Sequence, residues 1–319
     1  MFKDYRSWKK VARNVSNVTG RSYLYHFLDG TYCRYRYGCS PLHYGQGGFY
    51  KLRPFDRRRT YTIGRGMRLS RQLNGKAYSH LLINKEEFNR FYSPLISRSW
   101  LYAADADATE ILSFVKRLDT VFVKPTDKER GLGMRLLHAS EMTEEKASEI
   151  AGQKLLLEQY LVQHPNMEFG GGSVNTIRIT TMIDREGIVH LLKAMVRCGI
   201  GDSIVDNFCS GGVAYPVDLE LGVIEGTGVL HGRRTYEPIY VHPGTDTLML
   251  GRIIPFWAET VALVEKAAVM EPRLRFVGWD VAILPDGPEL IEGNTFPGAV
   301  LVDMTGSKRN IYEEIKRWM

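Results

Sequence analysis

Three residues near the C-terminal end of the chain have types and spacing suited to holding a metal ion. Glu292 and Asn294 lie two apart on an expected strand, so they project from one face, and Asp280 lies on the expected partner strand. Two carboxylates and an amide suit Mg²⁺, which takes oxygen ligands and completes its shell with water or phosphate oxygens. A solvated hairpin face would also explain the triplet, but the flanks VGWDVAIL and LIEG suggest burial, and buried carboxylates need a partner or a metal.

The register of this hairpin decides whether the three side chains meet. Asp280 faces Glu292 in an antiparallel pair only if the connecting loop has an odd number of residues centred on Asp286. We therefore expect a three-residue loop, 285–287. A two-residue turn at Asp286 and Gly287 would place Asp280 on the opposite face of the sheet.

A second candidate is Lys124, which ends a β-branched strand expected over 120–125. The following loop contains Gly131 and Gly133, where backbone N–H groups can approach phosphate oxygens while the lysine supplies a mobile charge. The chain contains no GxxxxGK[ST] sequence, so the loop is not a Walker A motif. A solvated lysine at a strand end is the plainer alternative.

Arg178 and Arg197 each lie in one of the two strands of an expected hairpin that turns at 184–187. A charged side chain in such a strand must face solvent, a carboxylate or a bound anion. The pattern leaves an ordinary exposed sheet face and an anion site equally open.

The other elements give an α+β layout with a strand-rich C-terminal half. Residues 1–75 show no sustained helical or alternating period, so short helices and loops are expected there. Asn84 with Glu87 resembles a helix capping box. The remaining pattern predicts helices over 84–92, 141–151, 253–270 and 308–319, a strand over 154–161, and a loop over 199–212.

The charge is unevenly distributed along the 319 residues. The formal net charge is +6, yet the first 71 residues hold 16 Lys and Arg against 3 Asp, which leaves the remainder at −7. Four cysteines without a CxxC pair favour a reducing cytoplasm. We expect no signal peptide and no transmembrane segment, since the apolar stretch 250–270 is interrupted by charges and reads as an amphipathic helix.

Four strings in order resemble the ATP-grasp superfamily, and most closely its sugar-transfer-associated family. They are VFVKPTDKERGLGM, LLLEQYLVQHPNM followed by SVNTIRITT, VDNFCSGGVAY, and VGWDVAILPDGPELIEGNTFPG. The resemblance covers about 80–300 and implies an ATP-grasp fold, in which two α+β subdomains grip ATP. It divides the chain into a basic, Tyr- and Arg-rich region at 1–78, a small subdomain with hinge at 79–170, and a C-terminal subdomain with the metal site at 171–319.

The same resemblance assigns roles to individual residues. Lys85 and Lys124 match lysines at the nucleotide phosphates, and the loop with Gly131 and Gly133 matches the flap over them, although Lys128, Glu129 and Arg130 replace small residues. Glu158 with the backbone of Gln159, Tyr160 and Leu161 matches the hinge that holds adenine and ribose. Arg178, Arg197 and Asn207 match positions beside the transferred phosphate, and Asp280, Glu292 and Asn294 match ligands of Mg²⁺, with two ions expected.

The implied activity is that of an ATP-dependent carboxylate–amine ligase with an acyl-phosphate intermediate. The expected partners are a small or sugar-linked anionic substrate, such as a sugar acid or amino acid in polysaccharide or related biosynthesis, and an amine. An ATP-grasp kinase acting on a hydroxyl and a nucleotide-binding scaffold without turnover stay open, as does a homodimer. The basic N-terminal region could bind an anionic substrate, a nucleic acid or a membrane, or simply pack against the body; with no RNA-binding motif, nucleic acid is not expected.

Overall fold

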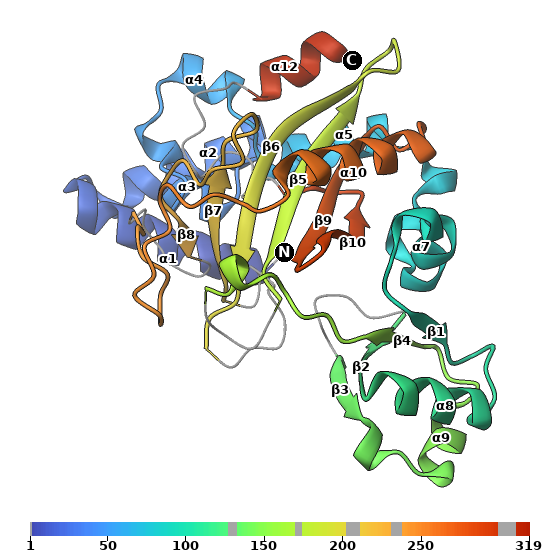
Figure 1. The fold of residues 1–319 in the computed structure, drawn as a ribbon. Coiled ribbons are helices and arrows are strands. Elements are labelled where there is room, and N and C mark those ends of the chain that lie inside the picture. The colour runs from blue at the N-terminus through green and yellow to red at the C-terminus, as the bar shows by residue number, and fades with distance from the viewer. Residues whose placement is uncertain (1, 127–132, 170–173, 202–210, 231–237, 299–310) are drawn as a thin grey trace.

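The computed structural model describes residues 2–126, 133–169, 174–201, 211–230, 238–298 and 311–319, with side chains from Arg6 onward. A larger lobe holds one sheet with helices around it, and a smaller sheet with its own helices forms a second lobe (Figure 1). The mixture of helices and antiparallel sheets confirms the expected α+β class.

The helices of the described residues include short 3-10 turns, labelled η. They are α1 (Phe2–Thr19), α2 (Tyr23–Tyr37), α3 (Pro41–Gly45), η1 (Phe49–Lys51), α4 (Pro54–Arg59), α5 (Ile63–Leu73), η2 (Lys76–Tyr78), α6 (His80–Ile83), α7 (Lys85–Phe91), η3 (Ser93–Leu95), α8 (Ala108–Leu118), η4 (Ala139–Glu141), α9 (Glu144–Ile150), η5 (Pro165–Met167), α10 (Trp257–Met270) and α12 (Ile311–Trp318).

The strands form two antiparallel sheets. The smaller sheet has the order β1-β4-β2-β3 and the larger one the order β10-β9-β5-β6-β7-β8. Their bounds are β1 (Trp100–Tyr102), β2 (Thr120–Pro125), β3 (Arg135–His138), β4 (Leu155–Gln159), β5 (Thr176–Ile183), β6 (Val189–Cys198), β7 (Val213–Val217), β8 (Val229–Leu230), β9 (Phe276–Leu284) and β10 (Gly287–Asn294).

Each lobe is built on its own apolar core. In the smaller lobe Phe114 and Val115 of α8 pack with Val121 and Val123 of β2. In the larger lobe the core side chains of β5, β6 and β9 meet those of α10 and of the α6–α7 segment, including Phe88. Helices α6 and α7 therefore pack with the larger sheet, and the chain enters the smaller sheet only at β1.

The N-terminal region differs from the sequence-based expectation of short helices and loops. Its first two helices have 18 and 15 residues. The buried face of α2 consists of His26, Gly30, Cys33 and Tyr37, at spacings of four, three and four residues. A helical period carried by His, Gly, Cys and Tyr does not stand out in the hydrophobicity of the sequence, so the sequence does not predict this helix. Gly30 is required there, because an added Cβ would lie 2.5 Å from the Trp8 ring of α1.

Most other expected elements are confirmed, including β2 at its expected bounds and the β5–β6 and β9–β10 hairpins. Asn84 caps the N-terminus of helix α7, and its side chain accepts hydrogen bonds from the backbone N–H of Glu86 and Glu87. The expected loop at 199–212 falls largely outside the described residues. No helix in the described part of the chain has the length and apolar character needed to cross a membrane.

Two buried histidines predict that the fold loses stability in mild acid. Burial lowers the pKa of His26, which Arg21 also lowers and Asp29 raises, and burial lowers the pKa of His242. A histidine with a depressed folded-state pKa stabilises the fold fully above its ordinary pKa of about 6.5, and that stability is lost as the pH falls through the folded-state value. The urea concentration at the unfolding midpoint should therefore decrease as the pH is lowered from about 7.5 to about 5.5. The decrease should be smaller for His26→Gln. An equal slope in that variant would exclude a contribution from His26.

Candidate functional site

The register of the β9–β10 hairpin brings the candidate metal ligands together, although by a different route from the one expected. Asp280 pairs with Glu292, as predicted. The loop is not the expected three-residue one: Gly287 pairs with Leu284, which leaves a two-residue turn at Pro285 and Asp286. A β-bulge between Leu290 and Glu292 restores the pairing, because the extra residue there shifts all later pairs by one position.

Asn294 completes this group on the same face of β10. Its Nδ2 lies 3.2 Å from Glu292 Oε1 and 3.5 Å from Asp280 Oδ2. The intervening Gly293 faces the other way, where an added Cβ would lie 2.6 Å from Leu82 Cδ2 of α6. The close packing of α6 on that side fixes the strand, so the polar side chains are held on the opposite face.

The two predicted arginines face this group across the sheet. Arg178 of β5 pairs directly with Asp280 of β9 and donates to both of its carboxylate oxygens, with Nη2 2.7 Å from Oδ2. Arg197 of β6 donates from Nη2 to the same Oδ2 at 2.9 Å and to Thr176 Oγ1 at 2.8 Å. Both arginines therefore face a carboxylate, one of the alternatives that the sequence left open.

The two carboxyl groups of this site have oppositely shifted pKa values. Burial alone would raise the pKa of Asp280, but Arg178 and Arg197 outweigh it and hold that pKa below the ordinary range. Burial raises the pKa of Glu292, and the adjacent Asp280 raises it further. Glu292 is therefore the carboxylate whose charge is least compensated by the protein, which favours a cation beside it.

Lys193 is a further cation on this face that the sequence analysis did not single out. It pairs with Thr180, which pairs with Gly278, which pairs in turn with Asn294, so all four lie in one row across the sheet. Lys193 is only 5% exposed. A lysine in the LLKAMVR run is a weak signal by itself, and only the register places it in the row beside Arg178 and Asp280.

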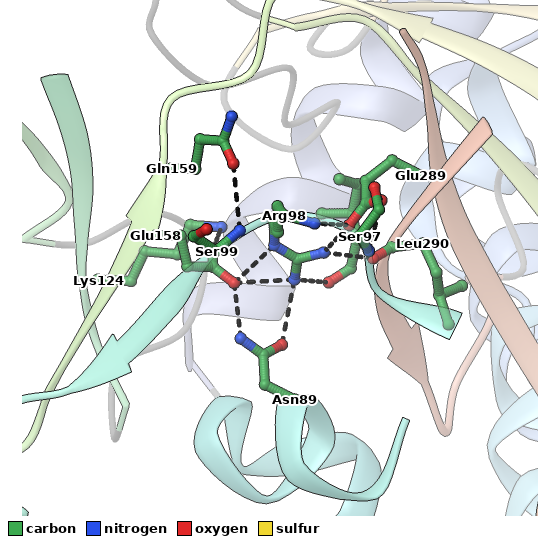
Figure 2. Close-up of polar contacts among 10 residues, drawn as sticks. Asn89, Ser97, Arg98, Ser99, Lys124, Glu158, Gln159, Glu289 and Leu290 are labelled. Carbon is green, nitrogen blue, oxygen red and sulfur yellow. Dashed lines mark hydrogen bonds and ion pairs between the residues drawn. The ribbon is translucent and has the colours of Figure 1, made fainter. Parts of the chain in front are cut away.

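Lys124 belongs to a second buried cluster, centred on Arg98 (Figure 2). Lys124 forms an ion pair with Glu158 Oε2. The other oxygen, Oε1, accepts hydrogen bonds from Arg98 Nε and Asn89 Nδ2, both at 2.8 Å. Burial would raise the pKa of Glu158, but Arg98 and Lys124 outweigh it and lower the pKa. With both oxygens engaged, Glu158 holds Lys124 and Arg98 in place.

The guanidinium of Arg98 joins this cluster to the strand that carries Glu292. Its Nη1 donates to Glu289 Oε1 at 2.7 Å and to the Leu290 carbonyl oxygen (Figure 2). Its Nη2 donates to the Ile291 carbonyl oxygen at 3.3 Å. The side chain of Arg98 is 2% exposed. Ile291 is the extra residue at the bulge, so Arg98 contacts the irregularity that sets the register of the metal ligands. The sequence around Arg98 does not indicate this role, because SRSW resembles an ordinary polar loop.

The remaining predicted nucleotide residues lie near Lys124, or at the end of β4 and just after it. Lys85 is half-buried at the start of α7, and its Nζ lies 3.3 Å from the Pro125 carbonyl oxygen at the end of β2. The backbone N–H of Gln159 donates to Ser99 at 2.8 Å, and that of Tyr160 to Thr120 at 3.3 Å. Leu161 follows these two residues and is half-buried.

Two predicted residues, Gly131 and Asn207, lie outside the described residues. Gly133 is described, and its φ of 77° is in the left-handed region that glycine adopts without strain. The structure thus brings together Arg178, Arg197, Asp280, Glu292 and Asn294 in one group, and Lys85, Lys124 and Glu158 in another.

The donor set of the first group fits a hard divalent cation. Asp280, Glu292 and Asn294 offer two carboxylates and an amide in mutual contact, the ligand types that Mg²⁺ takes. Within the described ranges no three His, Cys, Asp or Glu side chains gather into a metal-binding group. An ion bound here would take the Asn294 amide and non-protein ligands besides the two carboxylates. Both oxygens of Asp280 already accept from arginine, so an ion there would share or displace one of these contacts.

The likeness to solved structures is distant. The chain is 13% identical to the ATP-grasp ligase PsnB complexed with a phosphomimetic variant of minimal precursor, Mg and ADP, covering 77% of this chain and 60% of that one, with a TM-score of 0.46. D-alanyl-alanine synthetase A from Vibrio cholerae is 11% identical over 77% and 67% of the two chains, with a TM-score of 0.46. The ADP complex of purK, N5-carboxyaminoimidazole ribonucleotide synthetase, is 8% identical over 75% of this chain and 51% of that one, with a TM-score of 0.49.

The sequence itself gives the decisive comparison. No curated protein matches the chain. The family model described as sugar-transfer associated ATP-grasp matches residues 67–316, which include all of the residues discussed above as nucleotide or metal ligands. Because this match covers most of the chain, the protein belongs to the sugar-transfer-associated ATP-grasp family and has the ATP-grasp fold expected from its motifs.

Proposed function

We propose that the protein is an ATP-dependent carboxylate–amine ligase. The observation that carries the proposal is the convergence of Asp280, Glu292 and Asn294 with two arginines on one face of the larger sheet. Ligands for Mg²⁺ beside fixed positive charges are what phosphoryl transfer requires, since positioning and electrostatic stabilisation supply most of its catalysis.

Asp280, Glu292 and Asn294 would hold Mg²⁺, and we propose two ions in the loaded site. When bound, Mg²⁺ neutralises charge on the β- and γ-phosphates. Arg178 and Arg197 would face the transferred phosphoryl group as catalytic residues, and Asn207 is proposed beside it. Lys193 lies in the adjoining row and adds a third positive charge to the same face.

The second cluster is the proposed nucleotide site. Lys85 and Lys124 would contact phosphates, with the loop containing Gly131 and Gly133 over them, and Gln159, Tyr160 and Leu161 would border the adenine. Glu158 is proposed to act there by holding Lys124, because both of its oxygens already accept from protein groups.

The proposed reaction has two steps. A substrate carboxylate oxygen attacks the γ-phosphorus of ATP, and the bond from that phosphorus to the oxygen bridging it to the β-phosphate breaks. The products are ADP and an acyl phosphate. An amine then attacks the acyl carbon, the carbon–oxygen bond to phosphate breaks, and the amine loses a proton as the amide forms. We propose a sugar acid or amino acid as the carboxylate substrate, in polysaccharide or related biosynthesis. The association of the family with sugar transfer supports a sugar-linked substrate.

A screen for ADP release tests this proposal. The chain is incubated with Mg²⁺, ATP, pairs of carboxylates and amines drawn from amino acids and uronic acids, and a coupled ADP assay, with mass spectrometry of the products. We expect ADP release that requires both substrates and an amide product. A stable phosphate ester formed without an amine would instead establish a kinase, and nucleotide binding without ADP release from any pair would support a scaffold.

A further inference from the structure

Helix α2 has two apolar faces, and only one of them is covered. The face with His26, Gly30, Cys33 and Tyr37 packs into the N-terminal core beside Trp8 of α1 and Tyr44 of α3. The opposite face carries Leu24, Leu28, Tyr32 and Tyr35 at spacings of four, four and three residues, with Tyr25 beside them; we call these five residues the α2 stripe.

The side chains of the α2 stripe are strongly exposed. Leu24 is 60% exposed, Leu28 58%, Tyr32 55% and Tyr35 82%, and Tyr25 is 44% exposed. A single exposed apolar residue needs no explanation, but a contiguous row along one helix face marks an interaction surface. The buried face ties the helix to the protein body, so the row is held in a fixed orientation rather than on a mobile tail.

Positive charges border the α2 stripe on both sides. On one side Arg21 donates to the Tyr25 hydroxyl at 3.0 Å, and Arg36 is exposed one turn beyond Tyr32. On the other side the Arg13 guanidinium lies 6.0 Å from the Tyr23 ring centre, and Arg34 is half-buried. From Arg6 to Phe55 there are nine Lys and Arg and a single acid.

That single acid does not offset the surface charge. Asp29 is ion-paired with Arg57, whose Nη1 lies 2.7 Å from Oδ1, and it also accepts from the Tyr44 hydroxyl at 2.8 Å. The surface around the α2 stripe is therefore apolar along its axis and positive at its borders.

We propose that the α2 stripe docks the protein onto the surface of an anionic lipid bilayer. Leucines would enter the boundary between headgroups and acyl chains, tyrosines would lie at the headgroup level, and the bordering arginines would contact lipid phosphates. A nucleic acid would use the arginines but gain little from exposed leucines. A second copy of this chain would bring two basic borders against each other, which electrostatic repulsion opposes.

Vesicle flotation with the full chain tests the proposal. Binding is expected to vesicles of phosphatidylglycerol mixed with phosphatidylcholine and to be weak for phosphatidylcholine alone. It should weaken when salt shortens the Debye length from about 10 Å to about 3 Å. Leu24→Ser with Leu28→Ser should weaken binding at least about tenfold through lost apolar insertion. Arg21→Gln with Arg36→Gln should weaken it about fivefold for each arginine removed.

The matched control is Leu221→Ser with Ile188→Ser, two residues 70% and 56% exposed on the larger lobe. This pair should bind vesicles as the unsubstituted chain does, and circular dichroism should show all three double variants folded. Failure to float with anionic vesicles would overturn the proposal, as would unchanged binding of the leucine double variant. Dimers that the leucine substitutions dissociate, or salt-dependent binding to a nucleic acid that they leave unchanged, would also overturn it. None of these outcomes depends on the ligase reaction.

Discussion

Replacement of Arg98 by leucine should lower the free energy of unfolding by about 3–5 kcal/mol, the cost of breaking a buried ion pair by removing one partner. The substitution leaves Glu289 and one oxygen of Glu158 buried without their guanidinium partner, and it removes the donors to two backbone carbonyls at the bulge. Urea unfolding followed by circular dichroism measures the loss. Arg98→Lys should cost less, because it retains a positive charge but cannot span all of these acceptors.

Arg90→Leu is the matched control for Arg98. Arg90 also contacts two carboxylates, Glu86 and Asp105, but its side chain is 54% exposed. Exposed pairs contribute about 0–1 kcal/mol, so this variant should unfold close to the unsubstituted chain. If the two leucine variants lost equal stability, burial of the Arg98 cluster would have no energetic role.

Glu292→Gln should reduce Mg²⁺-dependent ATP turnover at least about 100-fold, since even groups that only orient a metal ligand cost about 10–100-fold when changed. The same substitution should leave the stability of the nucleotide-free protein unchanged or higher. Burial and Asp280 raise the pKa of Glu292, which means that its ionised form is unfavourable in the folded protein without a cation. Loss of activity together with retained stability would separate a functional defect from a folding defect.

Two thermal midpoints test the loss of metal binding directly. The thermal midpoint with ADP alone and with Mg²⁺ and ADP shows whether the variant has lost the metal-dependent stabilisation that ligand binding confers. Glu265→Gln, an exposed change on α10, is the control and should behave as the unsubstituted chain does. A variant at Glu292 with normal Mg²⁺ dependence would refute the metal assignment.

The sequence predicted most of the strands and the meeting of Asp280 with Glu292, because alternation and residue type are local properties. It could not predict how the meeting is achieved. A bulge depends on which backbone groups find partners, and here the carbonyl of Ile291 accepts from Arg98, a residue almost two hundred positions away. The role of Arg98 was likewise invisible, since nothing in its local sequence shows that Glu158 and Glu289 flank it in space.

The N-terminal helices show a second limit of prediction from the sequence. Their charge and aromatic content were plain, but the period was hidden, because α2 buries His, Gly and Cys while it exposes Leu and Tyr. A hydrophobicity pattern assumes that apolar residues are the buried ones. Where a helix has a second apolar face for another purpose, that assumption inverts the prediction.

The bulge at Ile291 also bears on how the hairpin should be aligned with other chains. Because its extra residue lies within the strand, a hairpin with a turn one residue longer and no bulge would present the same three polar side chains on the same face. Turn length and strand irregularity are thus interchangeable. The two hairpins have the same number of residues, so an alignment without a gap would match the three polar side chains correctly but exchange the inward and outward positions of residues 287–290.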